Sequence, residues 1–338
     1  MNRVDNARTE GPPTSADGRP TAAEIVFDRA TKTYPGRSEP AVRELSLTIG
    51  AGEICMLVGP SGGGKTTALK MINRLVSFDG GDIRIDGRSV RDLEVVELRR
   101  GIGYVIQQVG LFPHMTVGDN VATVPRLLGW EKARIRARVA ELLELVGLEQ
   151  GDARRYPSGL SGGQRQRVGL ARALAADPPV LLMDEPFGAL DPITRARLQQ
   201  EVRRLHSAVA KTVLFVTHDF DEAIMMGDRI AILREGGVVA QYDTPDAILA
   251  SPADDYVAEF IGEDRVLRRL ALHRVGELEL DPQPNEGGET VPHVSSGMTV
   301  RNALSLMLQA GGDRILVVGD DGATCGILRL ERVQELLQ

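Results

Sequence analysis

The chain has 338 residues, of which 42% are hydrophobic and 26% are charged, and its formal net charge is −7. This balance is ordinary for a soluble globular protein, and the length suggests about two domains. The composition excludes fibrous and collagen-like proteins. The negative charge also offers none of the basic surface that nucleic-acid binding requires, so we expect no nucleic-acid partner.

Cysteine usage and hydropathy limit the location of the protein. The only cysteines are Cys55 and Cys325, which make neither a disulfide framework nor a zinc-ligand pattern, and this favours a reducing cytoplasm. No stretch reaches the roughly 18 uninterrupted apolar residues of a membrane helix. Arg3 and Arg8 near the N-terminus are not followed by the apolar region of a secretory signal. We therefore expect no direct insertion into a membrane.

The composition and the pattern of apolar residues change along the chain. Residues 1–23 are polar, contain three prolines and have almost no aliphatic side chains, which predicts a disordered tail. From residue 24 to about 264, short apolar runs alternate with amphipathic stretches, which predicts an α/β domain around a mostly parallel sheet. The runs 54–58, 180–183 and 213–216 are continuously apolar, as is typical of strands buried on both faces. Residues 131–148 show helical spacing, and Gly236-Gly237 indicates a hairpin turn.

The strand predicted at 54–58 is followed directly by a phosphate-binding motif. Its residues match G-x-x-x-x-G-K-[ST] and are Gly59, Pro60, Ser61, Gly62, Gly63, Gly64, Lys65 and Thr66. In such a loop, successive backbone N–H groups cradle phosphate oxygens, and the helix that follows presents its positive end to the same anion. Lys65 would reach the β- and γ-phosphates, and the Thr66 hydroxyl would hold Mg²⁺.

A second motif lies at the end of the strand predicted at 180–183. Asp184 and Glu185 follow this apolar run, so the strand would deliver both carboxylates to the edge of the sheet beside the phosphate loop. Asp184 would then bind Mg²⁺, directly or through water. Glu185 can orient and polarise the water that attacks the γ-phosphate.

A third motif opens another helix. It consists of Leu160 followed by Ser161, Gly162, Gly163 and Gln164, and the residues after it are amphipathic and basic. The serine and the glycine N–H groups form a second anion site at a helix start. Two such sites can act on one γ-phosphate only if they face each other across a dimer.

Taken together, these motifs resemble those of the nucleotide-binding subunit of ABC transporters, whose signature motif is LSGGQ, over about residues 25–262. The resemblance implies an ABC-type P-loop NTPase domain at 24–264, with a RecA-like core, a helical subdomain and an antiparallel β part. It implies ATP and Mg²⁺ as cofactors. It also implies a head-to-tail homodimer. In this dimer each ATP contacts residues 59–67, which are the phosphate loop and Thr67, of one chain and residues 161–164 of the other.

The resemblance assigns roles to further residues. Tyr34 matches the aromatic residue that stacks on adenine, and Asp191 matches the D-loop aspartate. Gln107 matches the Q-loop glutamine, a ligand of the metal beside Thr66 and Asp184, although the adjacent Gln108 leaves this assignment open by one residue. His218 matches the switch histidine that touches the γ-phosphate. The catalytic set implied in this way is Glu185, His218 and Gln107.

The same resemblance implies a transport partner and a class of solute. The segment between Gln107 and the signature motif would grip a separate membrane permease, which places the ATPase at the cytoplasmic face of the cell membrane. Segments 97–108, 111–116, 124–130 and 260–265 resemble ATPases of osmoprotectant importers, which work with a solute-binding protein and carry glycine betaine, choline, carnitine or related quaternary amines. The same ATPase serving an amino acid, a polyamine or a betaine-like thiol remains an alternative, as does a non-transport ABC ATPase.

The C-terminal part of the chain is predicted to form a small unit of its own. Residues 265–290 are interpreted as a linker, and 291–338 as a small α+β unit of βαββα type. This unit resembles a single CBS motif, on account of Met298-Thr299-Val300 and the turn Asp320-Asp321-Gly322. Osmoprotectant ATPases of this kind often carry two such motifs, which form a regulatory site. A single motif could pair with its copy across a homodimer, where it would bind a ligand or serve dimerisation, or it could be vestigial.

Overall fold

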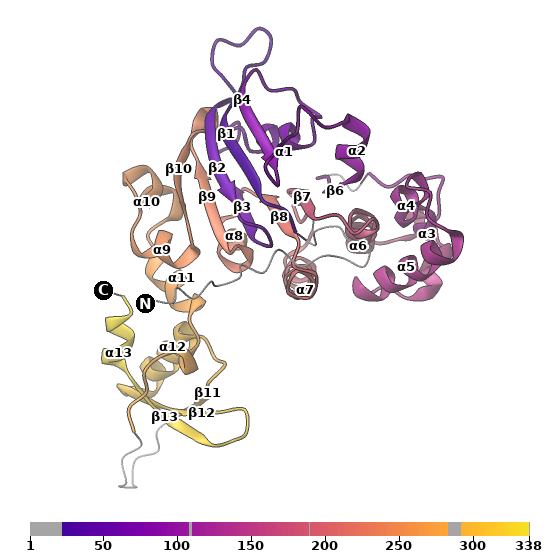
Figure 1. Cartoon of the computed structure of the whole chain (residues 1–338). Coiled ribbons are helices and arrows are strands. Elements are labelled where there is room, and N and C mark those ends of the chain that lie inside the picture. The colour runs from indigo at the N-terminus through magenta and orange to yellow at the C-terminus, as the bar shows by residue number, and fades with distance from the viewer. Residues whose placement is uncertain (1–21, 108–109, 189, 283–291, 338) are drawn as a thin grey trace, which may run out of the picture. The chain divides into compact units, whose positions relative to one another are not determined.

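The computed structural model describes residues 22–107, 110–188, 190–282 and 292–337. The chain divides into two compact units, Met1–Ala240 and Gln241–Gln338, and each is described here by itself (Figure 1). Most of the expected tail lies outside the described residues. Its last two residues, Ala22 and Ala23, are buried, and the Ala23 N–H donates to Thr212 Oγ1 at 3.2 Å, so the ordered fold begins before residue 24.

A six-stranded sheet forms the centre of the first unit. Its order is β10 (Val239–Asp243), β9 (Arg229–Leu233), β3 (Ile54–Val58), β8 (Thr212–Val216), β7 (Val180–Asp184) and β6 (Ile102–Val105), and the division of the chain after residue 240 falls within β10. The pairs from β9 to β6 are all parallel. Every residue of β3, β7 and β8 is buried, as their continuous apolar sequences predict.

Helices that follow the strands cover this sheet (Figure 1). α1 (Lys65–Ile72) packs against β7 and β8, α8 (Phe220–Met226) against β3, and α6 (Gly162–Leu174) against β6. α7 (Pro192–Val209), with 18 residues, is the longest helix in the described part of the chain. Three of these helices begin at a side-chain cap, in which Ser161, Asp191 or Asp219 accepts a hydrogen bond from a backbone N–H of the first turn.

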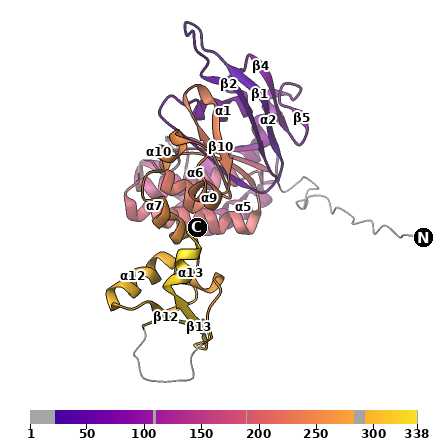
Figure 2. The same cartoon turned by 90° about the vertical axis from the view of Figure 1, so that its left-hand side faces the viewer.

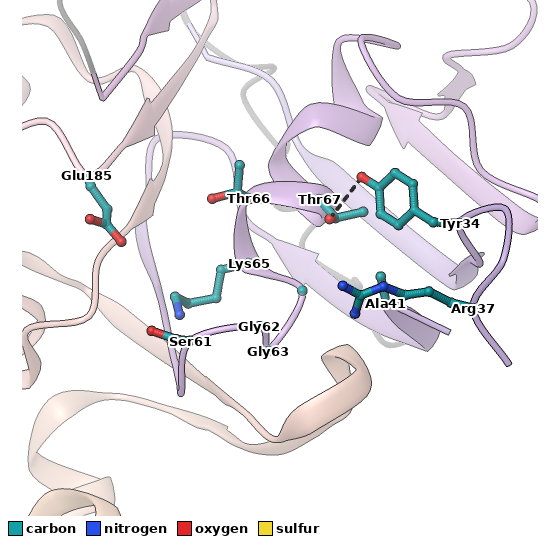
Figure 3. A pocket seen from close by; sticks show the side chains of 11 residues that line it. Tyr34, Arg37, Ala41, Ser61, Gly62, Gly63, Lys65, Thr66, Thr67 and Glu185 are labelled. Atoms are coloured by element: carbon teal, nitrogen blue, oxygen red, sulfur yellow. Dashed lines mark hydrogen bonds between the residues drawn. The ribbon is translucent and has the colours of Figure 1, made fainter. Parts of the chain in front are cut away.

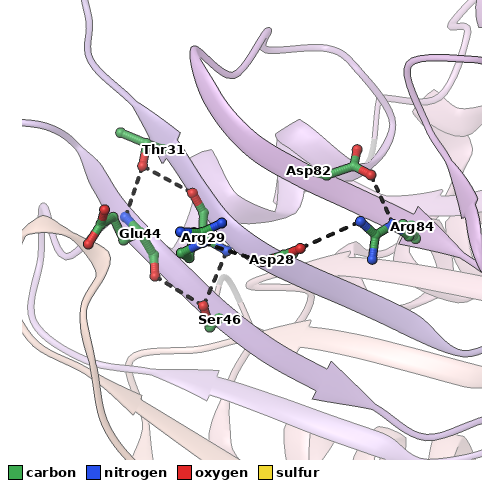
Figure 4. Close-up of polar contacts among 7 residues, drawn as sticks. All are labelled: Asp28, Arg29, Thr31, Glu44, Ser46, Asp82 and Arg84. Carbon is green, nitrogen blue, oxygen red and sulfur yellow. Dashed lines mark hydrogen bonds and ion pairs between the residues drawn. The ribbon is translucent and has the colours of Figure 1, made fainter.

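A four-stranded antiparallel sheet lies beside the parallel one. Its order is β2 (Val42–Ile49), β1 (Ile25–Lys32), β4 (Gly80–Ile85) and β5 (Arg88–Ser89). The register shifts between Phe27 and Ala30, where Arg29 has a φ of 48°. Side chains bind the backbone groups that the bulge frees: Arg29 N–H donates to Ser46 Oγ, and Glu44 N–H donates to Thr31 Oγ1 (Figure 4).

Four helices flank β6 in the chain. α2 (Val95–Arg100) precedes β6 and packs against it, and α3 (Val117–Val121), α4 (Thr123–Leu127) and α5 (Lys132–Leu145) follow it. α3 and α5 pack against α6 and so attach this group to the parallel sheet. The predicted helix at 131–148 is confirmed as α5, which ends just before Gly147 with its φ of 67°. The RecA-like core, helical part and antiparallel part expected from the sequence are therefore all present.

The second unit contains helices and a three-stranded sheet. Its helices are α9 (Pro245–Ala250), α10 (Asp255–Ile261), α11 (Arg265–Leu272), α12 (Val300–Ala310) and α13 (Leu330–Glu335). β11 (His293–Ser295) runs parallel to β12 (Arg314–Val318), which pairs antiparallel with β13 (Thr324–Arg329). α12 packs on β12 and α13 on β13 (Figure 2). The βαββα order is thus confirmed, while the resemblance to a CBS motif stays a prediction.

The expected linker differs most from the structure. Residues 265–272 form helix α11, and α11 packs against both α9 and α12. Leu270 of this helix and Val275 after it are fully buried in the core of the second unit. The compact unit therefore begins at Gln241, well before the boundary expected at 264. A helix as short as α11 has only about two turns, and these contain too few apolar positions for a helical periodicity to be recognised in the sequence. Linker residues 283–290 lie outside the described residues.

Every helix in these described ranges is too short or too polar to span a bilayer.

Replacing Leu270 with alanine should loosen the second unit. The side chain is fully buried, and removing such a leucine typically costs about 2–4 kcal/mol. Hydrogen–deuterium exchange of α12 and β12 in the full chain measures the effect, and we expect faster exchange there. Leu267→Ala on the same helix is the matched control, because Leu267 is 45% exposed. Equal effects of both substitutions would contradict the packing described for α11.

Candidate active site

The phosphate loop joins β3 to α1 and carries the buried Lys65. The Lys65 ammonium donates hydrogen bonds to the carbonyl oxygens of Gly59 and Pro60, both at 2.8 Å. Burial lowers the pKa of this lysine from its ordinary value, while the carboxylates of Glu185 and Asp184 act in the opposite direction. A buried cation that faces a cavity is stabilised when an anion enters, so the loop is suited to bind phosphate.

Thr66 and Asp184 form the next part of the site. The Thr66 hydroxyl donates to Asp184 Oδ1 at 2.9 Å, which joins the first turn of α1 to the end of β7. Burial raises the pKa of Asp184 from its usual value, and the hydrogen bond from Thr66 opposes this rise. A hydroxyl and a carboxylate are the oxygen donors that Mg²⁺ takes from a protein when phosphates and water supply the rest.

No larger metal cluster competes with this pair. Among the residues that the structure describes, no group of three or more His, Cys, Asp or Glu side chains could hold a metal ion. The donor set at Thr66 and Asp184 therefore fits a metal that arrives with a phosphate ligand, and it does not fit a metal held by protein alone.

Two side chains contact the same carboxylate oxygen of Glu185. Gln107 Nε2 donates to Glu185 Oε2 at 3.0 Å, and His218 Nδ1 lies 3.3 Å from the same oxygen. Glu185 has a φ of 45°, a left-handed conformation that is disfavoured for a residue with a Cβ atom. Its N–H donates to the Val216 carbonyl of the neighbouring strand at 2.9 Å, which holds the backbone in this conformation. Both side-chain contacts leave Oε1 available to accept a proton or a hydrogen bond from water.

A cavity of about 410 Å³ opens next to these groups. Figure 3 shows Tyr34 and Arg37 on one side of it, Glu185 on the other, and Lys65 and Thr66 between them. The Tyr34 hydroxyl lies 3.3 Å from Thr67 Oγ1, so the two residues close one end together. The predicted residues at the cavity wall are Tyr34, Ser61, Gly62, Gly63, Gly64, Lys65, Thr66, Thr67 and Glu185.

Steric contacts explain why position 64 of the phosphate loop is a glycine. Gly64 has a φ of 79°, and a Cβ atom there would lie 2.3 Å from the carbonyl oxygen of Ala41. Ala41, at the end of the segment 33–41, therefore packs directly against the phosphate loop. Any larger residue at position 64 would push these two walls of the cavity apart.

The signature residues lie elsewhere on the same unit. Ser161 and Gln164 cap each other at the start of α6: Gln164 N–H donates to Ser161 Oγ, and Ser161 N–H donates to Gln164 Oε1. Ser161 and Gly162 are exposed and do not line the cavity. Asp191 is an exposed cap of α7, and the hydrogen bond from the Thr194 N–H lowers the pKa of its carboxyl. Within one chain, the structure does not bring these residues to Lys65.

The structure adds residues that sequence analysis missed. Arg37 and Ala41 line the cavity, but neither belongs to a recognisable motif. Four residues after His218, Glu222 is buried and accepts a hydrogen bond from Gln199 Nε2 at 2.9 Å. Burial raises the pKa of Glu222, and a hydrogen bond from the Thr217 side chain opposes the rise. Glu222 thus joins α7 to the segment that carries His218, a contact that only the three-dimensional arrangement reveals. Gln108, the alternative to Gln107, lies outside the described residues.

Comparison with known proteins identifies the family. The model of the family described as "ABC transporter" matches residues 42–188. The choline transport ATP-binding protein OpuBA of Bacillus subtilis strain 168 is 47% identical over 313 residues, which cover 92% of this chain and 80% of that relative. The chain belongs to the ATP-binding proteins of ABC transporters.

Other relatives agree with this assignment. The glycine betaine uptake system ATP-binding protein YehX of Escherichia coli strain K12 is 46% identical over 91% of this chain and 98% of that relative. A dimeric structure of the ATP-binding cassette MJ0796 with bound ADP and Pi is 37% identical, with a TM-score of 0.59, and covers 65% of this chain and 98% of that one. The predicted ABC cassette fold is confirmed, and with it an ATPase that binds ATP.

Replacing Lys65 with methionine should weaken ATP binding by this ABC ATPase. The ammonium is the buried cation of the phosphate loop, and losing a charged hydrogen-bond donor to phosphate should raise the Kd for ATP by about 100-fold. Isothermal titration calorimetry checks this. Lys132→Met, the same change on the exposed surface of α5, is the control and should bind ATP as the parent protein does.

Proposed function

We propose that ATP binds in the cavity between Tyr34 and Glu185, with its phosphates on the loop 59–67. Stacking of adenine on Tyr34 would place the triphosphate along the line from Tyr34 to Lys65. The observation that carries this proposal is the Glu185 carboxylate, held by Gln107 and His218 at the far end of the same cavity. A carboxylate with one fixed and one available oxygen is suited to orient and deprotonate an attacking water.

Mg²⁺ belongs to the same proposal. Thr66 Oγ1 and Asp184 would hold it beside the β- and γ-phosphates, and Gln107 can add its amide oxygen because its Nε2 already donates to Glu185. The ion would neutralise charge on the phosphates as the bond to the γ-phosphate breaks. His218 would contact the γ-phosphate and so report its presence to α8, which begins two residues later.

We further propose that two copies of the chain complete each site. Ser161, Gly162 and Gly163 present a helix start to solvent, a geometry that binds anions, yet they lie outside the cavity of their own chain. In a head-to-tail homodimer, the signature residues 161–164 and Asp191 of one chain would face the phosphates bound by the other. The dimeric cassette structure that resembles this chain supports such an arrangement.

Substitutions at Ser161 should separate nucleotide binding from hydrolysis. Ser161→Asp keeps a good helix cap for α6, because aspartate caps as well as serine does, but places a negative charge against the partner's phosphate. We expect hydrolysis to fall at least about 100-fold, with the ATP affinity of the monomer within about twofold of the parent. Steady-state ATPase assays and calorimetry provide the two readouts.

The control for this prediction is Ser158→Ala, an exposed serine of the same loop. It should leave both readouts unchanged. If Ser161→Asp instead abolished ATP binding by the monomer, the signature motif would act within its own chain and the dimer proposal would be wrong.

We propose that the ATPase energises import of quaternary-amine osmoprotectants of the glycine betaine, choline and carnitine type. The relatives named for choline and glycine betaine transport support this class of solute, because they match about nine-tenths of this chain at 46–47% identity. The partners would be membrane permease subunits and a solute-binding protein, and the ATPase would sit on the cytoplasmic face of the membrane.

Reconstitution tests the solute class. The ATPase, the neighbouring permease and the solute-binding protein are placed in proteoliposomes, and ATP hydrolysis is measured with glycine betaine, choline, carnitine or a polar amino acid. We expect stimulation by at least one quaternary amine and none by the amino acid, with Glu185→Gln as the inactive blank. Stimulation by the amino acid alone would contradict the assigned solute class and leave the ATPase assignment intact.

A further inference from the structure

A tight turn fixes Arg37 beside Tyr34. The Arg37 N–H donates to the Tyr34 carbonyl oxygen at 3.1 Å, with Pro35 and Gly36 at the two central positions. Gly36 has a φ of 78°, as the third residue of a type II turn requires. Because the turn closes on itself, Tyr34 and Arg37 project from nearly the same place. Both side chains line the proposed nucleotide cavity.

The guanidinium group of Arg37 faces the phosphate loop. Figure 3 shows the side chain reaching into the cavity from the side of Tyr34, toward the wall formed by Ser61–Gly63. The close approach of Gly64 to Ala41 holds the segment that carries Arg37 against this loop. A ligand that lies between Tyr34 and Lys65 must therefore pass the guanidinium.

A second arginine, Arg43 at the start of β2, differs from Arg37 in its contacts. Arg43 forms an ion pair with Glu39, and it lines a neighbouring cavity together with Arg37 but does not line the nucleotide cavity. Among the described residues, the Arg37 side chain has no hydrogen bond or ion pair. The charge of Arg43 is thus matched by a carboxylate. The charge of Arg37 is instead available inside the nucleotide cavity.

The charged side chains at the cavity wall indicate which phosphate Arg37 could bind. The charged side chains at the cavity wall are Arg37, Lys65 and Glu185. Lys65 sits at the end of the cavity near Glu185, where the terminal phosphates are expected. The phosphate next to the ribose would lie nearer to Tyr34, out of reach of a single lysine. A guanidinium fork matches the geometry of two phosphate oxygens, and its affinity for phosphate exceeds that of a neutral donor.

We propose that Arg37 binds the α-phosphate of the nucleotide and so sets nucleotide affinity together with Lys65. This inference rests on the proposed ATP site. It adds a phosphate-binding residue that lies outside the phosphate loop, on the segment that also carries Tyr34. Because the α-phosphate is common to ATP and ADP, Arg37 should contribute equally to the binding of both.

The test compares full-length Arg37→Gln, Arg37→Lys and Arg43→Gln with the parent protein. Calorimetric titrations with MgATP and MgADP give the affinities, and thermal unfolding checks the fold. Arg37→Gln should raise both Kd values about tenfold, the loss expected for one charged hydrogen-bonding contact. Arg37→Lys should lose less, because it keeps the charge, and Arg43→Gln should stay within about twofold of the parent. All variants should unfold at the parent temperature.

Three results would overturn the inference. Arg37→Gln could bind both nucleotides like the parent, it could lose affinity for MgATP alone, or Arg43→Gln could lose as much affinity as Arg37→Gln. The first result would mean that Arg37 makes no contact with the nucleotide. The second would mean that Arg37 contacts the γ-phosphate. The third would mean that the positive charge around residues 37–43, and not a specific contact of Arg37, sets the affinity. A parent protein that bound neither nucleotide would instead overturn the proposed ATP site itself.

Discussion

The parallel pairing of β3, β8 and β7 is the constraint on which the rest of the site depends. These strands are neighbours and run in one direction, with Leu57 opposite Val216 and Asp184 opposite Val216 in register. The segments that follow them must therefore leave the sheet at one edge. Lys65, Glu185 and His218 come together because each follows one of these three strands, although they are far apart in the sequence.

The strained backbone of Glu185 is held by several contacts at this edge of the sheet. Its left-handed backbone conformation is disfavoured by about 1–2 kcal/mol, and it persists because a hydrogen bond to Val216 and the contacts with Gln107 and His218 all support it. The result is a carboxylate fixed beside a buried lysine. Burial lowers the pKa of Lys65 and raises the pKa of Asp184, and each shift favours the neutral form of the group. Bound phosphate and metal would favour the charged forms of both groups.

Much of this arrangement could be predicted from the sequence. The apolar runs of β3, β7 and β8 and the motif 59–66 are local patterns, and they sufficed to place Lys65, Thr66, Asp184 and Glu185 at one edge. The roles of Tyr34, Gln107, Asp191 and His218 came only from the family resemblance, because a single tyrosine, glutamine, aspartate or histidine carries no pattern of its own.

What could not be predicted depends on contacts distant in the sequence. Arg37 is one arginine among many, and its place at the cavity follows from a turn and from the packing of Ala41 against Gly64. The sequence does not distinguish helix α11 from a linker, because the burial of this helix depends on its contacts with α9 and α12. In both cases, the position of the segment depends on the residues that pack against it, and the amino-acid composition does not reveal these contacts.

The central claim is that one chain holds half of each ATP site and a second copy supplies the rest. The most direct measurement is the molar mass of the Glu185→Gln protein with and without MgATP, by light scattering coupled to size-exclusion chromatography. This variant should bind ATP without hydrolysing it. The account predicts that the MgATP-bound protein has the mass of two chains. MgATP bound stably to protein with the mass of a single chain would contradict it.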